Sequence, residues 1–173
     1  KKFEKDIIES LHWLGLEWDE GPIAAAAEGQ LFTNDYKGKF GPYRQSERLD
    51  IYEKYLKQLL DENKAYWCFC SKEQLESDRQ AMLAQGLAPK YSGRCRTITK
   101  EESGKRVERG EPAVIRFRTP EVSVEFTDII RGRVKFDAAL IGDMVIAKSL
   151  REPLYNFTNV VDDSLMEISH VIR

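Results

Sequence analysis

All three cysteines of this 173-residue chain lie between residues 68 and 95. Cys68 and Cys70 are separated by one residue, and Cys95 follows after 24 intervening residues. Structural zinc prefers thiolate ligands and binds four ligands in a tetrahedron. Three thiols supply one ligand too few, and the two histidines, His12 and His170, lie far away in the sequence. The spacing therefore leaves two interpretations open: a zinc site with a fourth ligand of another type, or three cysteines without a metal.

A second group of polar residues lies near the C-terminal end. Tyr155 and Asn159 are four residues apart, so on a helix they would share one face and offer a hydroxyl and an amide together. Arg173 follows Asp163 by ten residues and could hold a substrate carboxylate with its guanidinium. Taken alone, each of these residues fits a structural or solvated role better than a functional one.

Residues 65–120 are locally basic, with 11 Lys/Arg against 7 Asp/Glu in a chain of net charge −2. Such a segment could face nucleic acid, although an excess of this size is more typical of an ordinary solvated surface. The candidate phosphate contacts are Arg94, Arg96, Arg116 and Arg118.

The composition indicates a globular protein, with 42% hydrophobic and 32% charged residues. No apolar run approaches the length of a membrane span. An odd number of cysteines argues against a secreted disulfide framework and favours a reducing compartment.

Apolar periodicity and capping boxes predict four helices in the first part of the chain. They cover residues 3–14, 51–60, 71–85 and 99–110, and the last two begin with the capping boxes Ser71–Gln74 and Thr99–Glu102. Residues 21–42, bracketed by Gly-Pro pairs, are predicted to form a long loop.

The period then changes from that of a helix to that of a strand. Strands are predicted over residues 65–70, 115–117, 122–126, 134–136 and 143–148, and a short helix followed by a strand over 168–173 ends the chain. Helices first, strands in the middle and a βα-like return suggest two units, one inserted into the other.

Several long sequence segments in this chain occur in the same order and with the same spacing as in a known family. They are WLGLEWDEGP, GPYRQSERLDIYEKYLKQLLDENKAYWCFCSKEQLE with YSGRCR, PAVIRFRTP, FTDIIRGRVKF and LYNFTNVVDDSLMEISHVIR. Together they resemble the bacterial and organellar glutamyl-tRNA synthetases over essentially the whole chain.

The resemblance implies an α/β fold, namely parts of a class I Rossmann-type catalytic domain with an inserted α+β connective domain that binds the tRNA acceptor end. Residues 1–64 and 148–173 would belong to the catalytic domain. Residues 65–147 would form the connective domain, with a zinc-binding knob at 66–96.

The resemblance also implies a function. The intact enzyme would activate glutamate with ATP and Mg²⁺, attach it to tRNA(Glu), and act as a monomer in the bacterial cytoplasm or an organelle. Tyr155, Asn159 and Arg173 match positions that line the glutamate pocket, and a guanidinium, a phenol and an amide suit an acidic amino acid.

The family also suggests a fourth zinc ligand. Many relatives complete the Cys-x-Cys pair with Cys-x-His, but the residue at the histidine position is Thr97 here. Some members of the wider family instead use a tyrosine four residues before the third cysteine, which is the place of Tyr91. We therefore expect Cys68, Cys70, Tyr91 and Cys95 to bind structural zinc. The alternative is that Tyr91 packs in the core and that water takes the fourth ligand position, or that no metal binds at all.

The chain departs from the family in two ways. It contains neither a HIGH-like nor a KMSKS-like motif, both of which contact ATP, so we expect an internal fragment that does not activate glutamate by itself. In SLREPLYNFT, the residues Leu150, Arg151 and Glu152 stand where a turn with glycine is usual, which leaves the geometry of this loop open.

Two rival functions remain. One is the shorter paralogue that attaches glutamate to queuosine in tRNA(Asp), which the length of the parent gene would distinguish. The other is a stand-alone zinc-containing module that binds RNA without catalysis. Residues of the glutamate-pocket type argue against that module, because binding RNA does not require them.

Overall fold

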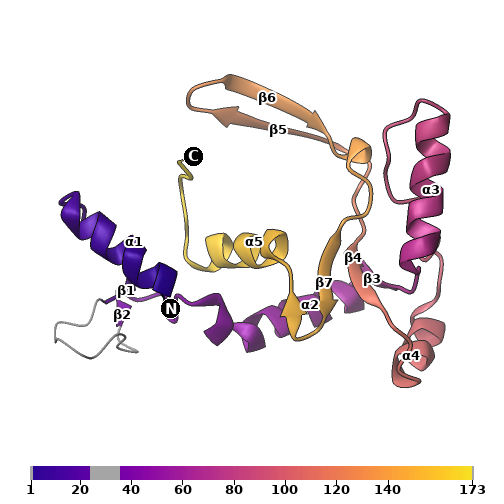
Figure 1. The fold of residues 1–173 in the computed structure, drawn as a ribbon, viewed down its shortest axis with the longest axis horizontal. Helices are drawn as coiled ribbons and strands as arrows, with labels where there is room; N and C mark the ends of the chain where they lie inside the picture. The colour runs from indigo at the N-terminus through magenta and orange to yellow at the C-terminus, as the bar shows by residue number, and fades with distance from the viewer. Residues whose placement is uncertain (1, 24–35, 173) are drawn as a thin grey trace. The chain divides into compact units, whose positions relative to one another are not determined.

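The structure is a computed structural model that describes residues 2–23 and 36–172 (Figure 1). The chain divides into two compact units, one formed by Lys1–Leu49 with Asp162–Arg173 and the other by Asp50–Val161. All three cysteines belong to the second unit. The domain boundaries expected from the sequence remain a prediction, because contacts alone define these two units.

The first unit begins with the helix α1 (Lys2–Trp13), which confirms the helix predicted over residues 3–14. Gly15 follows it with φ of 69°, a left-handed conformation that suits a glycine at a helix end. The strands β1 (Gly21–Pro22) and β2 (Tyr36–Lys37) pair antiparallel inside the segment predicted as a loop, and the 3₁₀ helix η1 covers Gln45–Glu47. The remainder of that predicted loop, residues 24–35, lies outside the described residues.

Two arginine–carboxylate pairs hold the first unit together. Arg48 is 3% exposed, and its Nε donates to Asp162 Oδ1 at 2.7 Å. Arg44 donates from Nη2 to Glu4 Oε1 at 2.7 Å. A buried guanidinium with a hydrogen-bonded carboxylate is costly to break from one side, so these pairs fix local geometry.

Helices α3 (Lys72–Ala84) and α4 (Lys100–Glu108) lie within the second unit, whereas α2 (Leu49–Asp61) and α5 (Tyr155–Leu165) cross its boundaries. The capping box at Ser71 is confirmed in both directions: its hydroxyl accepts from the Gln74 amide at 3.2 Å, and its amide donates to Gln74 Oε1 at 2.9 Å. Thr99 caps α4 by accepting from the Glu102 amide at 3.2 Å.

A four-stranded antiparallel sheet carries the core of this unit, in the order β3–β4–β7–β8. Its strands are β3 (Ala65–Cys68), β4 (Val114–Phe117), β7 (Val145–Ser149) and β8 (Glu152–Pro153). Ile115 and Ala147, paired across β4 and β7, are fully buried, as are Tyr52 and Leu56 of α2. The β3–β4 pairing sets Ala65 opposite Phe117 and Cys68 opposite Val114.

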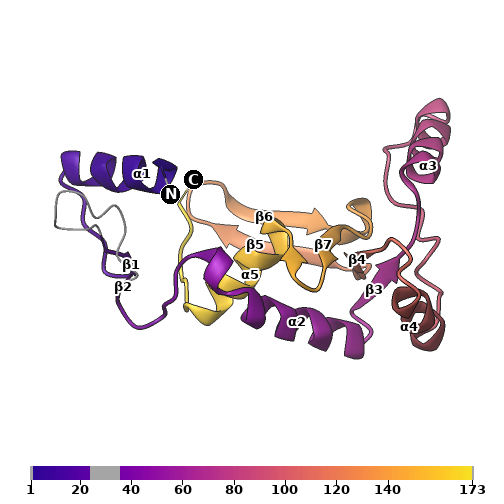
Figure 2. The same ribbon diagram turned by 60° about the horizontal axis from the view of Figure 1, so that its bottom comes forward.

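The strands β5 (Ser123–Asp128) and β6 (Gly132–Asp137) form a separate two-stranded hairpin, followed by the 3₁₀ helix η2 (Ala138–Leu140) (Figure 2). Its cross-strand pairs place apolar side chains on one face, including Val124 opposite Phe136. These two side chains and Phe126 are 42–52% exposed.

One predicted strand is wrong. Residues 168–172 are not a strand, and residue 173 lies outside the described residues. A strand requires hydrogen bonds to a neighbouring strand, and no described segment supplies them to residues 168–172. Every strand pairing in the described part of the chain is antiparallel, so these residues do not by themselves form the parallel sheet of a Rossmann-type domain. In this part of the chain no helix is long and apolar enough to cross a membrane.

Candidate functional site

Local structure brings the cysteines together. Cys68 ends β3 and is 2% exposed, and Cys70 stands immediately before the cap of α3. The helix α3 leads the chain away and Gly86 ends it, with φ of 70°. The chain then returns through residues 87–95, so that Tyr91 and Cys95 meet the first two cysteines.

Four side-chain atoms converge at this point. The three cysteine Sγ atoms lie within 4.8 Å of one another, and Cys70 Sγ is 3.6 Å from Cys95 Sγ. The Tyr91 hydroxyl oxygen is 3.3 Å from Cys68 Sγ and 3.4 Å from Cys70 Sγ. The four residues expected from the sequence as metal ligands are therefore neighbours in space.

Backbone groups fix this arrangement. The Cys95 amide donates to the Tyr91 hydroxyl at 3.0 Å, and the Phe69 amide donates to Cys95 Sγ at 3.4 Å. Gly93, with φ of 80°, makes the turn that lets residues 91 and 95 converge, and the Arg96 amide closes it on the Gly93 carbonyl at 2.8 Å. The site is thus held by its own loop.

Three of the six distances between these ligand atoms are close to those of a tetrahedral zinc site. With zinc–sulfur bonds near 2.3 Å and zinc–oxygen bonds near 2.0 Å, the edges of a tetrahedron measure about 3.5–3.8 Å. The separations of Cys70 from Cys95 and of Tyr91 from both Cys68 and Cys70 are 3.3–3.6 Å. A set of three sulfurs and one oxygen selects zinc over calcium or magnesium, which prefer oxygen ligands.

The site shifts the acidity of its own groups. Burial raises the pKa of the Cys70 thiol to about 11, a shift that its hydrogen bond with Tyr91 opposes and its contact with Cys95 increases. Burial opposes ionisation of Cys68 as well, but the Tyr91 hydroxyl, the Cys70 amide and the Arg116 guanidinium together outweigh it and lower the pKa of that thiol. Burial and the contacts with Cys68 and Cys70 raise the pKa of the Tyr91 phenol.

The four arginines predicted to contact RNA lie in different environments. Arg94 is exposed, and its Nη2 donates to Asp78 Oδ1 at 2.6 Å. Arg96 and Arg118 are half-buried and donate to the backbone carbonyls of Thr119 and Asn63. Arg116 is 7% exposed, which makes it a poor candidate for a phosphate contact, because bulk-accessible nitrogens are needed for one.

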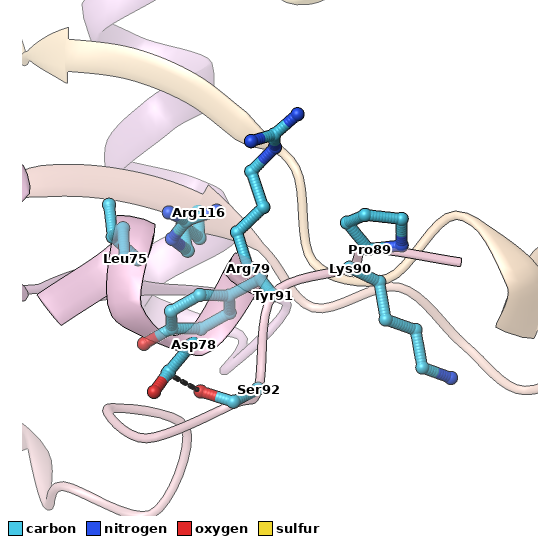
Figure 3. Close-up of a pocket in the computed structure, with 8 residues that line it drawn as sticks. All are labelled: Leu75, Asp78, Arg79, Pro89, Lys90, Tyr91, Ser92 and Arg116. Carbon is cyan, nitrogen blue, oxygen red and sulfur yellow. Dashed lines mark hydrogen bonds between the residues drawn. The ribbon is translucent and has the colours of Figure 1, made fainter. Parts of the chain in front are cut away.

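Arg116 also lines a pocket of about 240 Å³ beside the cysteine cluster (Figure 3). The other lining residues are Leu75, Asp78, Arg79, Pro89, Lys90, Tyr91 and Ser92. In Figure 3 the Arg116 guanidinium lies over the Tyr91 ring, and Asp78 accepts a hydrogen bond from the Ser92 hydroxyl at 2.8 Å.

Sequence reasoning missed Asp143, which is 4% exposed and joins several of these residues. Its carboxylate accepts from the Tyr66 hydroxyl at 2.6 Å and from the Thr119 amide at 2.9 Å, while its backbone carbonyl accepts from Arg116 at 2.7 Å. No local pattern in IGDMVIAK marks this aspartate as buried, because its partners come from distant strands.

Comparisons with known proteins decide the family. The profile of the tRNA synthetases class I (E and Q), catalytic domain, matches residues 1–173. The chain belongs to this family.

Its class I synthetase relatives include a glutamate–tRNA ligase 1 of Thermoanaerobacter sp. (strain X514), 49% identical, and a glutamate–tRNA ligase of Sulfurihydrogenibium sp. (strain YO3AOP1), 46% identical. Each alignment covers 100% of this chain but 34% of the relative, so the chain spans about a third of their length. A crystal structure of a glutamate tRNA ligase from Elizabethkingia meningosepticum, in complex with its amino acid, is 36% identical with a TM-score of 0.78, covering 98% of this chain and 33% of that one.

Of the residues expected to line a synthetase glutamate pocket, Tyr155 and Asn159 both lie on α5, one helical turn apart. Tyr155 is 61% exposed, so its hydroxyl is accessible. Arg173 lies outside the described residues.

The loop that departs from the usual synthetase sequence is a tight turn between β7 and β8. Its turn residues are Leu150 and Arg151, and Lys148 bridges to Glu152 at 2.6 Å. Arg151 is held by Asp50 and by Glu53, the latter at 2.8 Å. These contacts provide a turn without the glycine expected from the family.

Proposed function

We propose that this chain is part of a glutamate–tRNA ligase, which activates glutamate with ATP and Mg²⁺ and attaches it to tRNA(Glu). The observation that carries the proposal is identity of 46–49% to proteins named glutamate–tRNA ligase over the full 173 residues. The solved relative that holds its amino acid supports the same substrate class.

Tyr155, Asn159 and Arg173 are proposed to bind the glutamate. The first two offer a hydroxyl and an amide from one face of α5. A guanidinium at position 173 would pair with a carboxylate in a bidentate geometry that a neutral amino acid cannot reproduce. A neutral analogue would leave these polar groups unpaired, which costs affinity.

The test is glutamylation by the full-length protein with purified tRNA. Charging of tRNA(Glu) with glutamate is the expected result. Transfer only to queuosine-containing tRNA(Asp) would assign the protein to the paralogue, and RNA binding without glutamate-dependent pyrophosphate exchange would leave a binding module.

Cys68, Cys70, Tyr91 and Cys95 are proposed to hold a structural zinc ion. The ion would favour the deprotonated forms of the thiols and of the phenol, because a bound divalent cation stabilises anions at its ligands. Its proposed role is to fix the loop of residues 87–95 against the end of β3, in a region proposed to face the tRNA acceptor end.

Tyr91→Phe is expected to retain the fold but to release zinc to a chelator at least about tenfold faster than the wild type, because one of four ligands is lost. The measurement is zinc per chain together with the rate of transfer to a chromogenic chelator. The matched control is Tyr55→Phe, an aromatic change on α2 outside the cysteine cluster. Zinc held as tightly in Tyr91→Phe as in the wild type would exclude the tyrosine as a ligand.

Binding of an acceptor-stem minihelix to the full-length protein is expected to weaken about tenfold or more between low and physiological salt, because phosphate contacts release counterions. Arg94 is the exposed member of the predicted set, and Arg94→Gln should reduce the slope of this dependence. An affinity that does not change with salt would contradict an electrostatic contact.

A further inference from the structure

Arg116 is a buried cation without a carboxylate partner. Arg116 lies in β4 and is 7% exposed. Its Nη1 donates to the Asp143 backbone carbonyl at 2.7 Å. Its Nε is buried and has no hydrogen-bond partner among the described residues. Within the same residues no carboxylate lies at ion-pair distance from it, and the Asp143 carboxylate instead contacts Tyr66, Thr119 and Arg96. Burying a charge without a counter-ion costs several kcal/mol, so an anion is expected nearby.

The register of the sheet shows which side chains adjoin Arg116. Arg116 pairs with Tyr66, and Cys68 pairs with Val114, so Arg116 and Cys68 are diagonal neighbours on one face of β3 and β4. The Arg116 Cζ atom is 3.8 Å from the centroid of the Tyr91 ring (Figure 3). The guanidinium therefore adjoins two of the four residues of the cysteine–tyrosine cluster.

The cysteine–tyrosine cluster would carry excess negative charge with zinc bound. Three thiolates exceed the two positive charges of zinc by one, and an ionised phenol adds a second excess charge. A buried anionic centre is itself unfavourable without a compensating cation. The Arg116 guanidinium and the anionic centre are adjacent, so each can serve as the counter-ion of the other.

We propose that Arg116 is the counter-charge of this metal centre and the positioning residue for the Tyr91 ring. The proposal rests on the zinc site proposed above. Arg116 does not bind the metal; it holds the ring by stacking and stabilises the excess negative charge through the field of its guanidinium. Groups that orient metal ligands in this way commonly change metal affinity by about 10–100-fold when they are replaced.

The test measures the zinc dissociation constant of the full-length protein by competition with a chromogenic chelator. Arg116→Met removes the charge at similar volume, and Arg116→Lys keeps the charge without the planar stack. The matched control is Arg118→Met, because Arg118 lies two residues further along the same face, over the Tyr66 ring at 5.0 Å, and donates to Asn63.

Arg116→Met is expected to weaken zinc binding by about 10–100-fold. Arg116→Lys should lose less zinc affinity than Arg116→Met does. Arg118→Met should bind zinc with the affinity of the wild type. In the Tyr91→Phe background, Arg116→Met should weaken zinc binding by a smaller factor, because the charge of the phenol is no longer present to be balanced. A general loosening of the fold would instead give the same factor in both backgrounds, which would overturn the proposal.

Other outcomes are equally decisive. If the wild type binds one zinc and Arg116→Met binds it with the same affinity, Arg116 is not the counter-charge. If the wild type binds no zinc, the metal site itself is wrong and the inference fails with it. If Arg116→Met keeps its zinc affinity but loses RNA binding, the guanidinium serves an anion in the adjoining pocket. Should Arg116→Met fail to fold, a loss of affinity in Arg116→Lys relative to Arg118→Lys decides whether the stacked guanidinium is needed.

Discussion

The Cys95→Ser variant is expected to bind less than a tenth of the zinc held by the wild type and to unfold at a lower temperature. Cys95 is 6% exposed, and its sulfur accepts from the Phe69 amide as well as lying 3.6 Å from Cys70 Sγ. A hydroxyl is a much weaker zinc ligand than a thiolate. Because the binding free energy of a structural metal contributes to folding, loss of the ion should destabilise residues 50–161.

The measurement is zinc per chain together with the midpoint of thermal unfolding, with and without a strong chelator. The chelator should lower the midpoint of the wild type and leave that of Cys95→Ser unchanged. Thr97→Ala is the matched control, since Thr97 is exposed, lies two residues away and should not affect zinc. A full equivalent of chelator-resistant zinc in Cys95→Ser would remove the sulfur from the proposed ligand set.

Asp143→Ala is expected to lower the free energy of unfolding by about 3–5 kcal/mol, the range for removing one member of a buried charged network. The change would leave the Tyr66 hydroxyl and the Thr119 amide without their partner, and Arg96 without its carboxylate. Unsatisfied buried donors cost more than the lost bonds themselves.

Urea denaturation of the zinc-saturated protein measures this effect. Asp143→Asn keeps an acceptor oxygen and should lose less, whereas Asp61→Ala, at an exposed position near the end of α2, should stay within about 0.5 kcal/mol of the wild type. A loss below about 1 kcal/mol for Asp143→Ala would mean that the network around Asp143 contributes little to stability.

The sequence predicted the elements whose signals are local. The capping box at Ser71 and the apolar stripe of α2 both depend on residues a few positions apart, and both are confirmed. The approach of Tyr91 to Cys95 was expected from the resemblance to the family, in which some members have a tyrosine four residues before the third cysteine.

Features that depend on distant partners were not predictable in this way. Because side chains alternate along β4, Arg116 lies on the face of the strand opposite to the buried Ile115, and we expected its side chain to be exposed. The ring of Tyr91 packs over this face and buries Arg116. Asp143 gave no signal because its partners lie on β3 and after β4. The strand predicted over residues 168–173 failed because β-propensity describes a preference for a sheet, and a sheet requires a neighbour.

The hairpin β5–β6 is expected to unfold separately from the rest of the second unit. None of its strand residues is buried, and an isolated two-stranded ribbon is at most marginally stable in water. Its backbone amides should therefore exchange with deuterium far sooner than those of β4, where Ile115 and Arg116 are buried. The hairpin is expected to melt and re-form as a separate cooperative unit while the four-stranded sheet stays intact. A segment with that freedom can change its conformation when a partner binds without the sheet having to unfold.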